Sequence, residues 1–330
     1  MARSLHGLAR PGLLARADPG PRPQQLLLLL LARHHEHGGL HQPEGSVMRR
    51  IRTIPVLAGS VVLTAVLAAL APTSAQAAVA CNETALVAAI NAANSAGGGN
   101  VVLATDCVYT IASSHSSDTD GANALPIITT AITLTGDNDT ITRSTTAGTA
   151  GFRIVKVAAG ASLTLKGNVT LSNGSAVTDG GGILNYGAVT LTASALTGNT
   201  AQGRGGGLAN EDIGAPQKGA VATFTNSTVA GNSATGQGGG IYNGLRGSLT
   251  TTSSFIDAGN SSGSQGGGIA AIGSTSTTLT STQISANHAV MTAGGIYRQN
   301  GTMTLTTTPV SGNTPDNCVG SSPSVPGCVG

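Results

Sequence analysis

The pattern of glycine and apolar residues repeats along most of the chain. A run of two or three glycines followed by a branched apolar residue occurs five times, and this apolar residue recurs at intervals of 25 to 33 residues. The apolar positions are Ile183, Leu208, Ile241, Ile269 and Ile296. Self-similarity at roughly 20–50 residues is typical of solenoids and arrays. The sequence therefore predicts a repeat architecture in which no unit buries its apolar side alone.

An asparagine recurs with similar spacing. The recurring residues are Asn173, Asn199, Asn232, Asn260, Asn287 and Asn313. Stacked Asn side chains can hydrogen-bond from one repeat to the next, and Asn also tolerates the left-handed backbone of a tight turn. We therefore predict a structural asparagine ladder through these six residues. The unit that ends at Asn260 is offset by one residue, which indicates a bulge or a longer turn.

Within each unit the apolar and polar residues alternate with a period of two. One unit consists of Gly-Gly-Gly-Ile-x-Asn, then Val-Thr-Leu-Thr, then Ser-x-Leu-x-Gly-Asn. This alternation predicts three short strands and no helical stripe. We expect an all-β fold, a right-handed single-stranded parallel β-helix over residues 101–316, with about eight rungs at roughly 4.8 Å each. The glycines are expected to supply positive φ and close backbone approach.

One segment has a helical pattern. Residues 84–94 place Leu86, Val87 and Ile90 on one stripe, and a run of three glycines follows at 97–99. The end of a solenoid exposes core and unpaired strand edges unless something covers it. We therefore predict that residues 78–100 form an N-terminal cap.

The segment before this cap has a different composition. Residues 1–47 hold five of the seven His in a Pro/Arg-rich context, and we interpret them as a disordered upstream extension before a start at Met48. A metal site at His34, His35 and His37 is the alternative. Residues 48–77 combine a basic start, an apolar stretch and a small-x-small site, which indicates a signal peptide. We expect a secreted, extracellular protein with no transmembrane span in its mature form.

The four cysteines fit this expectation. Export makes disulfides plausible, and the cysteines form two local pairs at the two ends of the body. Three connectivities are possible, and local pairing suits a rod because its ends lie far apart. We predict Cys81–Cys107, and also Cys318–Cys328 within a C-terminal loop of residues 317–330.

The charge of the chain gives little information about its binding partners. The net charge is +2, but from residue 78 onward there are 8 Lys/Arg against 11 Asp/Glu, so the body is slightly acidic and no nucleic-acid partner is expected.

The helical segment, the stretch at 125–128 and the Gly-Gly-Gly-Ile and Gly-Asn-x-Ala units resemble secreted bacterial right-handed parallel β-helix repeat proteins of the pectin-lyase-like superfold. The Gly-Gly-Ile units with Phe224 and Asn226 are also similar to polymorphic outer-membrane protein repeats. The resemblance covers residues 81–328 and implies a fold that hosts lyases, hydrolases, esterases and adhesins.

Candidate catalytic chemistry is sparse in the sequence. The acids look scattered, so we assign no catalytic and no metal-binding residue and expect no cofactor. Asp118 with Asp120, and Asp137 with Asp139, are interpreted as polar turns, with Ca²⁺ binding as the alternative.

Five charged residues near the Gly-rich strands are candidates for binding. Arg204, Arg246 and Arg298 flank these strands in three repeats and are predicted to line one sheet edge. An insert at 209–219 adds Glu211 and Asp212.

Threonines alternate with inward residues on the second strand of each repeat. They are Thr190, Thr192, Thr223, Thr225, Thr250, Thr252, Thr278, Thr280, Thr304 and Thr306. Stacking predicts two outward columns on a flat face, which resembles the face of β-helical ice-binding proteins and also suits polysaccharide. Thr is in any case a good outward β residue. We expect a structural or adhesion-type protein that binds polysaccharide, a cell surface or a partner without catalysis. A polysaccharide lyase or glycoside hydrolase is the first alternative and ice binding is the second.

Overall fold

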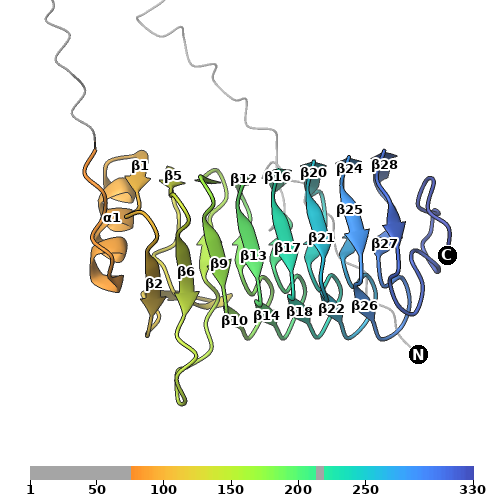
Figure 1. Cartoon of the computed structure of the whole chain (residues 1–330), viewed down its shortest axis with the longest axis horizontal. Coiled ribbons are helices and arrows are strands. Elements are labelled where there is room, and N and C mark those ends of the chain that lie inside the picture. The colour runs from red at the N-terminus through yellow and green to blue at the C-terminus, as the bar shows by residue number, and fades with distance from the viewer. Residues whose placement is uncertain (1–75, 213–218) are drawn as a thin grey trace, which may run out of the picture. The chain divides into compact units, whose positions relative to one another are not determined.

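The computed structural model describes residues 76–212 and 219–330, which form an all-β parallel solenoid preceded by one short helix (Figure 1). The predicted upstream extension, its His34, His35 and His37, and nearly all of the predicted signal peptide lie outside the described residues. The described unit is a row of coils, and each coil adds one strand to the same sheets.

Four parallel sheets run along the row, and three of them correspond to the predicted strands. The threonine sheet contains β1 (Gly98–Val102), β5 (Ala131–Thr135), β8 (Ser162–Lys166), β12 (Ala188–Thr192), β16 (Val221–Thr225), β20 (Ser248–Thr252), β24 (Ser276–Thr280) and β28 (Thr302–Thr306). The second sheet contains β2 (Val108–Ile111), β6 (Thr140–Arg143), β9 (Thr170–Ser172), β13 (Ala195–Thr197), β17 (Thr228–Ala230), β21 (Phe255–Asp257), β25 (Gln283–Ser285) and β29 (Val310–Ser311). The glycine sheet contains β7 (Val155–Val157), β11 (Ile183–Asn185), β15 (Leu208–Asn210), β19 (Ile241–Asn243), β23 (Ile269–Ile272) and β27 (Ile296–Gln299).

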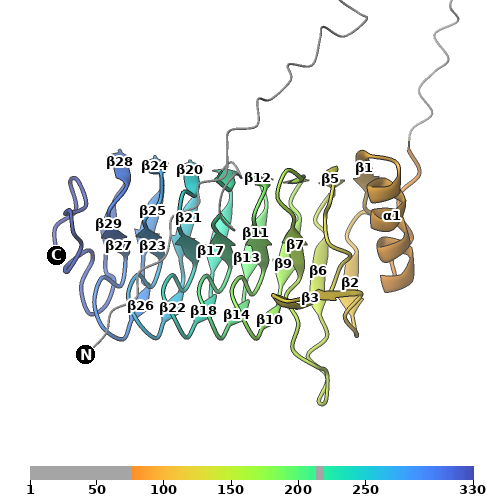
Figure 2. The ribbon, with the colours of Figure 1, turned by 180° about the vertical axis from the view of Figure 1, so that it is seen from behind.

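The fourth sheet was not predicted. Its strands are β10 (Ser175–Ala176), β14 (Thr200–Ala201), β18 (Ser233–Ala234), β22 (Ser261–Ser262) and β26 (His288–Ala289). They are two residues long, which is too short to give an alternation signal. An antiparallel hairpin, β3 (Ser116–Asp118) and β4 (Gly121–Asn123), also leaves the repeat, and Figure 2 shows β3 running along the row of coils rather than around it.

The repeating apolar residues stack in register. The branched apolar residues that follow the glycine runs pair successively along the glycine sheet and are fully buried. They are Ile183, Leu208, Ile241, Ile269 and Ile296. This confirms the predicted stacking and the predicted register. The one-residue offset before Asn260 comes from a longer turn. Phe255 pairs with Thr228, and the extra residue lies in the turn at Ala258 and Gly259, both with positive φ. Phe255 points outward as a result.

The glycine runs have two separate causes. The first glycine of a run has positive φ, for example +70° at Gly238. The second has no room for a side chain, because a Cβ on Gly239 would overlap the backbone of Ser261 on the neighbouring coil. Both predicted roles are confirmed at these positions.

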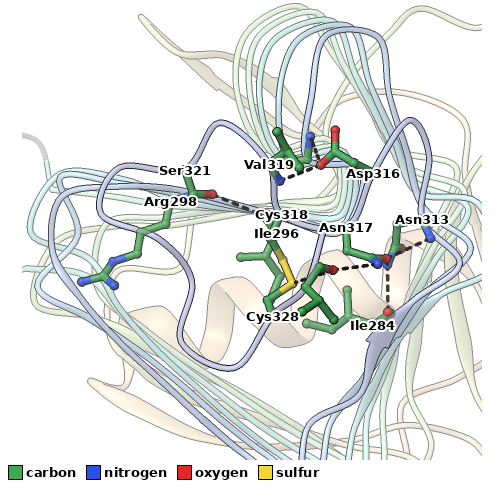
Figure 3. Close-up of a disulfide and its surroundings, with 12 residues drawn as sticks. Ile284, Ile296, Arg298, Asn313, Asp316, Asn317, Cys318, Val319, Ser321 and Cys328 are labelled. Atoms are coloured by element: carbon green, nitrogen blue, oxygen red, sulfur yellow. Dashed lines mark hydrogen bonds between the residues drawn. A yellow bond between two sulfur atoms is a disulfide. The ribbon is translucent and has the colours of Figure 1, made fainter.

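The asparagine ladder exists, with one predicted member wrong and one missed. The Oδ1 atom of Asn232 accepts hydrogen bonds from both N and Nδ2 of Asn199, at 2.9 and 3.0 Å. The ladder continues through Asn260, Asn287 and Asn313. Asn313 then donates to Asn317, at 3.0 Å, which makes Asn317 the last rung. Figure 3 shows this rung beside Ile284, whose carbonyl also accepts from Asn313.

Asn173 does not belong to this ladder. Ser172 pairs with Thr197, so Asn173 is level with Gly198 rather than with Asn199. It has a φ of 58°, close to the 61° of Gly198, and therefore supplies the left-handed residue of the turn. Its Nδ2 donates to Thr142 instead.

A second ladder was missed in the sequence. Asn185 donates to Asn210 at 2.7 Å, Asn210 donates to Asn243 at 2.8 Å, and Asn243 donates to the hydroxyl of Thr277 at 2.9 Å. All four side chains are buried at the end of the glycine sheet or in the adjoining threonine sheet. Buried polar groups need such partners, because an unpaired one is costly.

Both ends of the row are covered. Helix α1 (Glu83–Ser95) packs Leu86 and Ile90 against the first coil, and Asn82 caps it by accepting from the N–H of Ala85. The two predicted disulfides, Cys81–Cys107 and Cys318–Cys328, are present. The second closes a loop across the C-terminal end, where Cys318 is buried (Figure 3).

Candidate binding surfaces

The threonine sheet carries the predicted columns, and they are longer than the sequence suggested. The first column contains Thr133, Thr164, Thr190, Thr223, Thr250, Thr278 and Thr304 at one register position. The second contains Thr135, Lys166, Thr192, Thr225, Thr252, Thr280 and Thr306. Parallel strands are about 4.8 Å apart and residues i and i+2 are about 6.6 Å apart, which sets the grid of side chains.

The inward residues of this sheet are buried in the core. Leu191, Phe224 and Leu279 are fully buried between the two columns, as predicted. Thr251 stands at the same inward position, and its hydroxyl pairs with that of Thr282 at 2.8 Å. Lys166 is the one charged residue at the outward positions of this sheet, and no aromatic side chain points outward there. The face therefore presents mainly hydroxyl and methyl groups, with Lys166 as its one charge.

The glycine sheet carries a second, charged surface. Arg204 precedes β15, and its NH2 atom bonds Asp179 at 2.7 Å and Glu211 at 3.2 Å. Its NH1 atom donates to the hydroxyl of Tyr242 at 2.7 Å, and the guanidinium lies 4.4 Å from the centroid of that ring. One arginine thus joins two carboxyl groups and an aromatic ring.

Burial and these contacts change the pKa values of Glu211 and Tyr242. Burial raises the pKa of Glu211 to about 7, with Arg204 opposing this shift and the neighbouring Asp179 adding to it. Burial also raises the pKa of Tyr242, against the effect of Arg204. Glu211 therefore changes its charge near neutral pH while the arginine beside it stays protonated.

The hairpin β3–β4 extends this charged surface. Lys156, in β7, donates to Asp118 and, at 2.6 Å, to Asp120, and both aspartates come from the hairpin tip. Tyr186 follows β11, and its hydroxyl donates to Asp120 at 3.1 Å. Burial is the largest single effect on Asp118 and opposes its ionisation, but the hydrogen bonds from Lys156 and from the backbone N–H of Asp120, together with the charges of Lys156 and Arg153, lower the pKa of Asp118.

A buried arginine, Arg153, joins the hairpin β3–β4 to the coils. Arg153 is 1% exposed, and its NH2 atom donates to the carbonyls of Asp120 and Asp179 at 2.6 and 3.1 Å. Its NH1 atom donates to Asn123 at 2.8 Å. The hairpin is therefore fastened to the coils by ion pairs and by a guanidinium that the core encloses.

The sequence interpretation of the acids was wrong on this point. Asp179 and Glu211 look scattered along the chain, yet both bond Arg204, while Asp118 and Asp120 both bond Lys156. Arg153 lies between the two sets and donates to the carbonyls of Asp120 and Asp179. The residues missed are Lys156, Tyr186, Asp179 and Tyr242. A signal existed for Tyr242 alone, which occupies the variable position of a Gly-Gly-Gly-Ile-x-Asn unit.

The five predicted charged residues divide into three groups. Arg204 and Glu211 belong to the cluster, and the next residue, Asp212, pairs with Arg246 at 2.8 Å. The three arginines do not line one sheet edge, because Arg204 precedes β15, Arg246 follows β19 and Arg298 lies within β27. Arg298 donates to the carbonyl of Ser324 through its side chain and to the hydroxyl of Ser321 through its backbone N–H, each at 3.0 Å, so it fastens the C-terminal loop (Figure 3).

The acidic doublets proposed for Ca²⁺ have other contacts. Lys156 lies between Asp118 and Asp120. Asp139 is fully buried and accepts from the backbone N–H groups of Cys107 and Asp137, at 2.9 and 2.7 Å, which is a turn-building role. Within residues 76–212 and 219–330, no three His, Cys, Asp or Glu side chains are placed to hold a metal ion.

No family model, no curated protein and no solved structure matches this chain. The fold therefore stands on its own geometry: a parallel β-solenoid with stacked asparagines and capped ends. Helix α1 is too short to cross a membrane, and no longer apolar helix occurs in the described part of the chain. Two disulfides fit an extracellular protein.

Proposed function

We propose that this protein is a secreted, non-catalytic binding protein whose threonine face attaches to an ordered, neutral polysaccharide at a cell surface. The observation that supports this most is the column of seven threonines in register on one sheet. Six intervals of about 4.8 Å give a contact line of about 29 Å. A repeating ligand can meet every coil of such a line in the same way.

The chemistry of the face favours a neutral partner. Thr offers a hydroxyl that both donates and accepts, next to a methyl group. Each contact is weak in water, but a regular array makes many such contacts with one polymer. The surface is already ordered, so it loses little entropy on binding. Lys166 at one coil supplies too little charge to select an anionic polymer.

The proposal also includes the handedness and the superfold of the solenoid. We assign the chain to the right-handed β-helices of the pectin-lyase-like superfold, on the three long parallel sheets and the stacked asparagines. The signal peptide inferred from residues 48–77 and the two disulfides support export and an adhesion-type role.

Co-sedimentation with insoluble neutral polysaccharides tests the proposal. The panel contains cellulose, chitin and mannan, and the variant Thr223→Lys places a charge in the middle of the face. Gln283→Lys, on the exposed face of β25, is the matched control for charge and solubility. We expect one polymer to retain the wild type and the control but not Thr223→Lys. Retention of all three proteins alike, or of none, contradicts the proposal, and release of sugar products from the polymer would favour the lyase or hydrolase alternative.

Ice is a second candidate, favoured by the two-dimensional order of the face and by the lack of outward aromatic side chains on it. A thermal hysteresis measurement on the same proteins decides this. Hysteresis that Thr223→Lys abolishes and Gln283→Lys retains would assign the face to ice. Its absence at high protein concentration eliminates that candidate.

A further inference from the structure

The tip of the hairpin β3–β4 forms one wall of an open pocket beside β7 and the segments that lead into β5, β8 and β12. Its volume is about 530 Å³, within the range of about 300–1,000 Å³ that small-molecule sites occupy. Asp118, Asp120, Lys156 and Tyr186 form its polar wall, and Ile127 and Ala159 contribute apolar surface. An apolar lining with a few convergent polar groups is the usual composition of a ligand site.

The polar wall has hydrogen-bonding capacity left over. An ammonium group has three N–H bonds, and Lys156 directs two of them to Asp118 and Asp120. The Oδ2 atom of Asp120 accepts from Lys156 and Tyr186, while its Oδ1 atom accepts no hydrogen bond from the described residues. A donor and an acceptor are thus adjacent at the pocket wall.

We propose that this pocket binds a neutral saccharide. A sugar hydroxyl is donor and acceptor at once, so one hydroxyl can accept from Lys156 and donate to Asp120. The Tyr186 ring lines the pocket beside them and offers an apolar surface for the face of a sugar ring. The volume suits roughly one or two sugar rings.

The charges select against an acidic sugar. Two carboxylates and one ammonium line the pocket, and Arg153 is enclosed behind the hairpin, where its guanidinium bonds to backbone and Asn123. A uronate would meet the two carboxylates at the pocket wall, whereas Arg153, the second cation that acts on them, is buried and cannot pair with it. A neutral sugar has no such penalty, so its affinity should exceed that of the corresponding uronic acid.

The fixed geometry of the wall supports pre-organisation. Lys156 is 7% exposed and its nitrogen lies 5.2 Å from the centroid of the Tyr186 ring. Arg153 donates to the carbonyl of Asp120 and so holds the hairpin tip in place. Groups that are already positioned lose little freedom when a ligand binds.

Isothermal titration calorimetry of the purified protein with glucose, galactose, mannose, xylose and N-acetylglucosamine tests this site. The uronic acid of each sugar that has one is the matched anionic ligand. Two variants separate the contacts: Ala159→Leu fills the pocket, and Tyr186→Phe keeps the ring but removes the hydroxyl that holds Asp120. Gln283→Lys, on the exposed side of β25 and outside both surfaces, is the control, and circular dichroism checks that each variant is folded.

We expect at least one neutral sugar to bind, with affinity lowered about tenfold or more by Ala159→Leu, lowered less by Tyr186→Phe and unchanged by Gln283→Lys. If Ala159→Leu does not fold, the preference for neutral sugar over its uronic acid and the effect of Tyr186→Phe decide the question. The proposal is overturned if no neutral sugar binds, if a uronic acid binds as tightly as its neutral parent, or if folded Ala159→Leu binds like the wild type. Because co-sedimentation with Thr223→Lys tests the threonine face separately, failure here leaves the proposed function untouched.

Discussion

Replacing Asn232 by Ala should destabilise the solenoid strongly, because this side chain links three coils. Asn232 is fully buried. Its Oδ1 atom accepts from N and Nδ2 of Asn199, and its Nδ2 atom donates to the carbonyl of Leu196 at 2.9 Å and to Oδ1 of Asn260 at 3.0 Å. Alanine removes all four hydrogen bonds without giving the buried partners access to water.

The magnitude follows from the groups left unpaired. Nδ2 of Asn199 still donates to the carbonyl of Leu171, and Oδ1 of Asn260 still accepts from the backbone N–H at position 232. The backbone N–H of Asn199 and the carbonyl of Leu196 lose these partners. An unsatisfied buried polar group costs about 1–3 kcal/mol, so the variant should lose about 4 kcal/mol of unfolding free energy.

Asn173→Gly is the matched control, because the same sequence pattern includes Asn173 but the structure excludes it from the ladder. Glycine accepts the positive φ there, and the loss of the bond to Thr142 should cost about 0.5 kcal/mol. Guanidinium unfolding followed by circular dichroism gives both values. Because solenoids can open coil by coil, amide hydrogen exchange at Asn199 supplies a local measure. A loss below about 1 kcal/mol in Asn232→Ala, or equal losses in the two variants, would refute the reasoning.

Three further predictions concern other features of the fold. Gly239→Ala should prevent folding or cost more than about 3 kcal/mol, because its Cβ meets backbone; Gly259→Ala, with positive φ but open space, should cost about 1 kcal/mol. Circular dichroism melts compare the two. The pKa of Glu211 is raised from 4.5 to about 7 in the fold, so the folded protein binds this proton more tightly than the unfolded chain, and stability should fall as the pH rises from 4.5 to about 7. Glu211→Gln should flatten this slope in unfolding titrations. An unchanged slope would exclude Glu211 as its source. Cys318→Ser should cost about 2–3 kcal/mol and loosen the C-terminal loop, visible as faster proteolysis there; unchanged proteolysis would show that Arg298 and Asn317 hold the loop without the disulfide.

The sequence predicts the stacking well because each coil places the same residue type at the same position. Ile183 lies beside Leu208 and Ile241 in space, so one periodic signal determines the glycine sheet and its register. The threonine columns follow for the same reason. The error at Asn173 arises where the spacing misleads: 26 residues separate it from Asn199, whereas the paired strands Thr170–Ser172 and Ala195–Thr197 are 25 apart.

The charged cluster was not predictable by this route. Asp120 is 36 residues from Lys156 and 66 from Tyr186 in sequence, and the hairpin that carries it interrupts the repeat. Periodicity gives no register for such an insertion, so residues that converge in space look scattered along the chain. Arg298 illustrates the converse, because a position beside a Gly-rich strand did not distinguish a surface residue from one that fastens the C-terminal loop.

Acylation of Lys166 tests most directly whether the threonine face carries the binding. Lys166 stands within the second threonine column, between Thr135 and Thr192, and is exposed. The measurement compares, by mass spectrometry, its rate of acylation in free protein and in protein bound to the retained polysaccharide. We predict that binding slows acylation of Lys166 several-fold. An unchanged rate in protein that remains bound would contradict it and move the binding site off the threonine face.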